Sequence, residues 1–142
     1  FPHRALLAIM RESDIHARML WQLMARQAAI QRHWIYRAGR LRALPAIANL
    51  ICELDIRLQP CGREQNALVP LPLAQADLAE VSGLSTMHVG RVSKELRDAG
   101  LCTIPNGLAE IHDRSGLQRI GRFDSSYLCN AAGEEERSPT SL

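Results

Sequence analysis

Aromatic residues and long hydrophobic runs are both scarce in this sequence. Phe, Trp and Tyr make up 4% of the 142 residues, although 46% of all residues are hydrophobic. A core of this composition is packed through Leu, Ile, Val and Ala, which suits helices. No stretch approaches the roughly 18 consecutive apolar residues that would span a bilayer, so we expect no membrane partner. A chain of this length has room for one or two small domains.

The sequence also lacks the cysteine spacings that indicate a zinc site or a small disulfide framework. Its four cysteines are Cys52, Cys61, Cys102 and Cys129. We therefore expect no metal site, and reduced thiols in a cytoplasmic protein. The N-terminal residues are Phe1-Pro2-His3, with neither an initiator Met nor a signal peptide, so we expect the chain to begin partway through a longer protein.

Motifs typical of enzymes are missing as well. The histidines and nearby polar residues are scattered, without a nucleophile motif, a phosphate-binding loop or metal-ligand spacing. These residues are His16, His33, His88, His112, Asp14, Asp113 and Ser115. Asp113 is better explained as the N-cap of a helix over residues 114–120. We therefore expect no catalytic residue in the chain.

The net charge is only +2, and it is unevenly distributed. Residues 1–60 carry nine Arg against two Asp and two Glu, whereas residues 61–142 carry eight basic and eleven acidic residues. Three of the acidic residues, Glu134, Glu135 and Glu136, belong to a tail that we expect to be disordered. Because phosphate neutralisation dominates affinity for nucleic acid, the second half of the chain predicts only modest non-specific binding.

Two short helical patterns meet at a tight turn within residues 73–101. In the first pattern, small or aliphatic residues lie on one side and acidic residues on the other. The apolar positions are Leu73, Ala76, Leu78, Ala79 and Val81. Ser82-Gly83 then ends the pattern, because Gly adopts the left-handed conformation that a turn between two helices needs.

The second pattern follows this turn and precedes a predicted hairpin. Ser85 is a suitable N-cap, and Gly100 is a suitable C-terminal cap. Between them, Val89, Val92 and Leu96 recur at helical spacing. Residues 101–113 form two strand-like runs about a Pro-Asn-Gly turn, which is a strong hairpin signal. The order helix, turn, helix, hairpin predicts a winged helix-turn-helix, whose second helix can enter a DNA major groove.

Residues 83–91, G-L-S-T-M-H-V-G-R, resemble the turn and recognition-helix start of the Crp/Fnr family, the cyclic-AMP receptor protein and its relatives. Residues 123–128, F-D-S-S-Y-L, resemble a tail phrase of one subgroup. The resemblance implies a mainly α protein, in which a long dimerisation helix precedes a winged helix-turn-helix domain with a small β-hairpin wing. It implies that residues 1–40 contain a linker helix and the dimerisation helix. Residues 41–128 are then the DNA-binding domain, and residues 129–142 are the tail. The implied partners are double-stranded DNA, a second copy of the chain and RNA polymerase.

The resemblance also indicates which side chains meet DNA. They are Ser85, Thr86, Met87, His88, Gly90, Arg91 and Lys94. Arg91 matches the Arg that family members direct at a guanine. Thr86 and Met87 stand where the best-known members carry charged base readers, so here we expect contact with a thymine methyl. Gly90 indicates close backbone approach to DNA or simple tolerance of glycine. Phosphate contacts are expected from Ser85, His88 and Lys94, with Arg97, Arg114 and Arg119 as further candidates.

A short helix is predicted at residues 2–11. A long helix follows it, to about Ala38, because Ser13 suits an N-cap and Asp14 suits a first turn. Residues at heptad spacing predict a parallel coiled-coil dimer. This seam consists of Leu20, Leu23, Gln27, Ile30, Trp34 and Leu41. The alternative is packing within the chain through a second apolar set, Met19, Met24 and Ile35. The arginines of this helix are expected mostly to face solvent; they are Arg18, Arg26, Arg32, Arg37 and Arg40.

Gly39 is expected to end the long helix, and Pro45 to lie in the first turn of a helix over residues 45–59. The apolar stripe of that helix is Ile47, Leu50, Ile51, Leu54 and Leu58. Residues 39–44 are then either a hinge or an ordinary joint between helices. The Pro- and Gly-containing stretch 59–72 predicts a loop with a short strand at residues 67–71 that pairs beside the wing.

The resemblance leaves the effector open. Cyclic-AMP-binding members touch the base with hydroxyl side chains midway along the long helix, where this sequence has Gln31 and Arg32. The effector-binding β-roll would lie upstream of Phe1, so we assign no cofactor to this chain. We predict a sequence-specific transcription regulator that binds a palindromic operator as a homodimer through residues 85–99. The alternative is a winged-helix module for protein–protein interaction without DNA binding.

Overall fold

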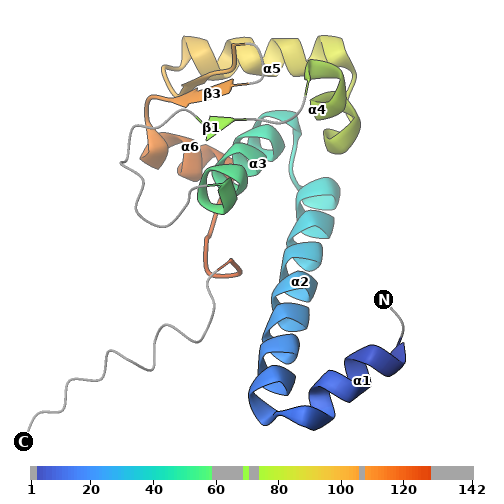
Figure 1. The fold of residues 1–142 in the computed structure, drawn as a ribbon. Coiled ribbons are helices and arrows are strands. Elements are labelled where there is room, and N and C mark those ends of the chain that lie inside the picture. The colour runs from blue at the N-terminus through green and yellow to red at the C-terminus, as the bar shows by residue number, and fades with distance from the viewer. Residues whose placement is uncertain (1–2, 59–68, 71–73, 106–107, 129–142) are drawn as a thin grey trace, which may run out of the picture. The chain divides into compact units, whose positions relative to one another are not determined.

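The computed structural model describes residues 3–58, 69–70, 74–105 and 108–128 (Figure 1). The Asn-Gly turn of the hairpin, Leu73, the tail at 129–142 and the thiols of Cys61 and Cys129 lie outside these ranges, and so do the predictions about them. The described residues form two compact units, residues 3–34 with 126–128, and Ile35–Ser125. No helix in the described ranges is both long and apolar enough to cross a bilayer.

The first unit is built mainly from two helices. α1 spans His3–Glu12, and α2 spans Asp14–Arg40 and passes into the second unit after Trp34. Ser13 directly precedes α2 and caps its first turn, as predicted. Its hydroxyl accepts a hydrogen bond from the Ile15 N–H at 3.2 Å, and its carbonyl accepts one from the Ala17 N–H at 3.1 Å.

The chain returns to this first unit at residue 126. The ring of Tyr127 stacks on that of His33, with centroids 3.9 Å apart and planes inclined by 13°. Leu128 is 4% exposed, and Ile30, one turn before His33, is 8% exposed. The F-D-S-S-Y-L phrase therefore ends on α2.

α2 continues through Gly39 to Arg40, so the prediction that Gly39 ends this helix is wrong. Glycine costs a helix interior only about 1 kcal/mol relative to alanine, which neighbouring contacts can offset. Leu41 lies beyond the helix end, although the heptad pattern included it. Its N–H still donates to the Arg37 carbonyl at 3.3 Å. Only Leu41 and Arg42 separate α2 from α3 (Ala43–Leu58).

α3 is the central helix of the second unit. Pro45 lies in its first turn, as predicted. Around α3 are α4 (Gln75–Ser82), α5 (Thr86–Asp98) and α6 (Arg114–Gly121), which share one hydrophobic core with it (Figure 1). Of the predicted stripe on α3, Ile47, Leu50 and Ile51 are buried, Leu54 is half-buried and Leu58 is exposed. The stripe therefore faces the core over its first three positions.

The predicted wing is an antiparallel pair of strands, β2 (Cys102–Thr103) and β3 (Leu108–Ile111). A third strand, β1 (Val69–Pro70), pairs antiparallel with the other edge of β3, which gives the order β1-β3-β2. This pairing confirms the strand predicted beside the wing. Ala109 of β3 is fully buried, so the small sheet is fixed to the helical core.

Candidate nucleic-acid interface

α4 and α5 meet at a turn with the geometry of a helix-turn-helix. Gly83 has a φ of +66°, in the left-handed region that glycine adopts without strain. The Gly83 N–H donates to the Glu80 carbonyl at 3.1 Å, and the Leu84 N–H donates to the Ala79 carbonyl at 2.8 Å. These bonds satisfy the last carbonyls of α4 and end it abruptly. The turn predicted at Ser82-Gly83 is confirmed.

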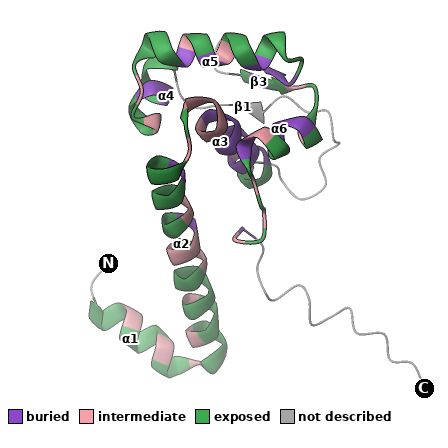
Figure 2. Cartoon of the chain, turned by 180° about the vertical axis from the view of Figure 1, so that it is seen from behind, coloured by how far each residue is buried: buried purple, intermediate pink, exposed green. Residues whose placement is uncertain are grey.

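α5 is capped at its start and buried along one side. The Ser85 hydroxyl accepts a hydrogen bond from the His88 N–H at 3.2 Å, which confirms the predicted N-cap. Val89, Val92 and Leu96 are 0%, 2% and 0% exposed, so they fix α5 on the core. The other sides of α5 are exposed, as Figure 2 shows. After the helix, Gly100 has a φ of +68° and turns the chain toward β2.

The residues predicted to bind DNA lie at the start and on the outer side of α5. Ser85, Thr86, Met87, His88, Arg91 and Lys94 are exposed, whereas Gly90 is half-buried. Met87, at 75% exposure, shares a helix face with Arg91 and Lys94, because residues four and seven positions apart align. In the described part of the chain, neither Arg91 nor Lys94 makes an ion pair, whereas Arg97 lies 3.6 Å from Asp98. Both cations can therefore reach a polyanion.

Gly90 and Arg114 both lie close to side chains of other helices. A Cβ on Gly90 would lie 3.2 Å from Nε2 of Gln75, the end of an exposed side chain of α4, so a close approach of DNA stays a prediction. The Arg114 guanidinium donates to both oxygens of Asp55, at 2.7 and 2.8 Å, and this bond raises the pKa of Arg114. Arg114 thus connects α6 to α3, and a phosphate contact by this half-buried side chain stays a prediction. Arg119 remains exposed.

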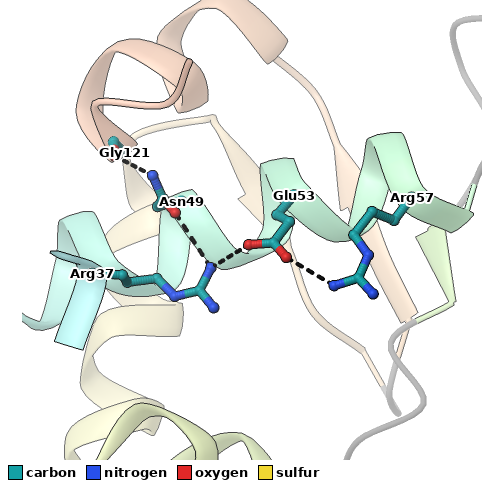
Figure 3. Close-up of polar contacts among 5 residues, drawn as sticks. All are labelled: Arg37, Asn49, Glu53, Arg57 and Gly121. Carbon is teal, nitrogen blue, oxygen red and sulfur yellow. Dashed lines mark hydrogen bonds and ion pairs between the residues drawn. The ribbon is translucent and has the colours of Figure 1, made fainter. Parts of the chain in front are cut away.

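A buried polar cluster at the end of α2 was not predicted (Figure 3). The Glu53 carboxylate of α3 pairs with Arg37 at 2.8 Å and with Arg57 at 2.9 Å. Arg37 also donates to Asn49, whose amide donates to the Gly121 carbonyl. Arg37 is 7% exposed, so the expectation that it faces solvent is wrong. A signal was present in the sequence: Glu53 interrupts the apolar run of α3, and a buried carboxylate needs a cation.

The residues predicted for the dimer seam differ in their exposure. Leu23 and Trp34 are 56% and 39% exposed, Gln27 is also exposed, and Leu20 is half-buried. Ile30 is covered within the chain. The second apolar set, Met19, Met24 and Ile35, is 55%, 64% and 72% exposed. α2 thus presents large apolar side chains to its surroundings, which is typical of helices that bind a partner surface.

Cys52 and Cys102 are free thiols in the core. Burial, and then the charge of Asp55, raise the pKa of Cys52 to about 12. Burial, and then the charge of Glu110, raise the pKa of Cys102 to about 11. A thiol that stays protonated is a poor nucleophile and a poor metal ligand. These two cysteines therefore act as small core residues.

The fold and the outward face of α5 define a winged helix-turn-helix protein. Residues 46–120, a little over half of the chain, match the family of Crp-like helix-turn-helix domains. The chain therefore belongs to the family of Crp-like helix-turn-helix domains. No curated protein matches the sequence.

Solved structures of Crp/Fnr regulators share the fold. FixK2 from Bradyrhizobium japonicum has a TM-score of 0.70 at 22% identity, over 82% of this chain and 57% of that one. CprK in complex with OCPA has a TM-score of 0.63 at 16% identity, over 84% and 55%. A CRP/FNR-family transcriptional regulator from Thermus thermophilus has a TM-score of 0.53 at 21% identity, over 67% and 48%. The chain thus spans about half the length of these proteins.

Proposed function

We propose that this chain binds a palindromic DNA operator as a homodimer, with α5 in the major groove, and thereby regulates transcription. The observation that carries the proposal is the outer face of α5. Met87, Arg91 and Lys94 share that face, and the two cations have no ion-pair partner among the described residues. The major groove is wide enough to admit a helix presented in this way.

The side chains of α5 suit different parts of the duplex. The planar fork of Arg91 matches O6 and N7 of a guanine. Thr86 and Met87, in the first turn, offer methyl groups to a thymine methyl. Ser85, His88 and Lys94 contact phosphates, which set the register of the protein on DNA.

The exposed apolar surface of α2 supports the homodimer. Leu20, Leu23, Gln27 and Trp34 recur at heptad spacing on one side of a 27-residue helix. Two such helices in parallel would bury this surface, and Gln27 would pair with its copy and set the register. A dimer of this kind reads two half-sites about 34 Å apart, one turn of DNA. We place this function in the cytoplasm, where RNA polymerase is a further partner.

A gel shift on palindromic DNA over a series of salt concentrations tests the proposal. The logarithm of the affinity should fall linearly with the logarithm of the salt concentration. Lys94→Gln should reduce that slope by about 1, because one phosphate contact is lost. Glu95→Gln is the matched control. It removes a negative charge from the residue next to Lys94, so it should not weaken binding. Absence of salt-dependent binding would favour the alternative, a winged-helix module that binds another protein.

A further inference from the structure

A buried carboxylate joins two arginines where α2 meets α3 (Figure 3). The side chain of Glu53 is 0% exposed, and each of its oxygens has its own partner. Oε2 accepts from Arg37 at 2.8 Å, and Oε1 accepts from Arg57 at 2.9 Å. Because water cannot reach Glu53, these arginines stabilise its charge.

The two arginines differ in what they connect. Arg57 lies one turn after Glu53 on α3, so that pair stays within one helix. Arg37 lies on α2, so its pair crosses from one helix to the next. The same Arg37 nitrogen donates to Asn49 Oδ1 at 3.3 Å, and Asn49 Nδ2 donates to the Gly121 carbonyl at 3.0 Å. Arg37 therefore links the end of α2 to both α3 and α6.

This link makes movement at the short joint between α2 and α3 unfavourable. The joint consists of Leu41 and Arg42, and Arg37 precedes it. Opening the joint would leave Glu53 in a dry site with one partner fewer, which is unfavourable. α3 in turn shares its hydrophobic core with α5. The last turns of α2 and the recognition helix therefore belong to the same packed body, Ile35–Ser125.

We propose that Arg37 is a positioning residue for operator recognition, which sets the half-site spacing that the dimer accepts by fixing the last turns of α2 on α3. The inference rests on the proposed function, because spacing matters only to a dimer on a palindrome. Two additional base pairs move one half-site by about 7 Å and rotate it by about 70°. A firmly attached recognition helix cannot follow that displacement, whereas a loosely attached one can.

The test compares Arg37→Gln with Arg57→Gln in the whole 142-residue chain. Each variant removes one arginine from Glu53, but only Arg37→Gln removes the link between helices. Affinity is measured on the preferred palindrome, on one with two more base pairs between its half-sites, and on a single half-site. On the longer spacer, wild type and Arg57→Gln should lose roughly 100-fold, because the second half-site is no longer engaged. Arg37→Gln should lose less than about tenfold, with single half-site affinity unchanged.

Two results would overturn the inference. The first is that Arg37→Gln discriminates against the longer spacer as strongly as wild type does. The second is that Arg37→Gln and Arg57→Gln tolerate the longer spacer equally well, which would assign the effect to the charge of Glu53. If wild type binds the palindrome no better than a single half-site, the proposed homodimer is wrong, and the inference fails with it. If circular dichroism shows that Arg37→Gln does not fold, Arg37→Lys takes its place. Lysine keeps a cation for Glu53 but lacks the planar guanidinium that donates to both Glu53 and Asn49, so the link between the helices is weakened and the same comparison of spacers decides.

Discussion

The thiol of Cys52 lies in the hydrophobic core, where ionisation is unfavourable. Burial, and then the charge of Asp55, raise its pKa from 9.0 to about 12. The folded state thus holds the thiol proton more tightly than the unfolded chain, so the stabilisation is complete below pH 9 and is lost as the pH rises toward about 12. We expect the free energy of unfolding to fall more steeply over this range in wild type than in Cys52→Ala. Urea unfolding at successive pH values measures both slopes, and parallel slopes would contradict the prediction.

Arg91 is the residue on which base recognition should depend most. Arg91→Ala should weaken operator binding by about 1–3 kcal/mol and relax the preference at one base pair. Arg97→Ala is the control, because it removes the same charge from the same helix beside Asp98. Affinities for operators substituted at one position at a time measure the effect. An equal loss on every operator would identify Arg91 as a phosphate contact.

Single residues were predictable where their partners are close in sequence. The N-caps Ser85 and Asp113 accept from backbone N–H groups three residues later, so local spacing was enough. Arg114 and its partner Asp55 are 59 positions apart. The number of arginines on a helix could not show that Arg37 meets Glu53 on another helix. Ion pairs of this kind depend on the tertiary fold.

At the scale of helices, close packing determines where glycine is required. A Cβ on Gly121, at the end of α6, would lie 2.7 Å from the backbone nitrogen of Asn49. A Cβ on Gly39 would meet nothing within 4 Å. The sequence predicted that α2 stops at Gly39, because glycine is a poor helix former. That local preference was too weak to end a helix whose last turns are held by Arg37 on α3.

Alanine at these two glycines should therefore have opposite effects. Gly121→Ala forces α6 away from α3 and should destabilise the protein by about 1–3 kcal/mol. Gly39→Ala adds a methyl group in open space within α2 and should stabilise it by about 0.5–1 kcal/mol. Denaturant unfolding of both variants beside wild type measures the two changes. Destabilisation by Gly39→Ala would show that this position needs glycine after all, as a hinge would.

At the scale of the whole molecule, α2 exposes a large apolar surface, which the proposed dimer would bury. The heptad spacing was visible in the sequence, because it depends only on the helical repeat. It could not show that Ile30 is covered within the chain or that Leu41 lies past the helix end. Leu20, Leu23, Gln27 and Trp34 are the positions that remain for a partner helix.

Leu23→Asp and Met24→Asp test whether this seam forms the dimer. The two residues are adjacent on α2 and similarly exposed, at 56% and 64%, but their side chains point about 100° apart. Leu23→Asp places a charge on the seam, so it should shift the chain toward monomer and weaken palindrome binding by up to roughly 100-fold, with single half-site affinity unchanged. Met24→Asp should remain dimeric. Analytical ultracentrifugation and gel shifts measure both. Dissociation by Met24→Asp alone would place the interface on the second apolar set instead of the seam.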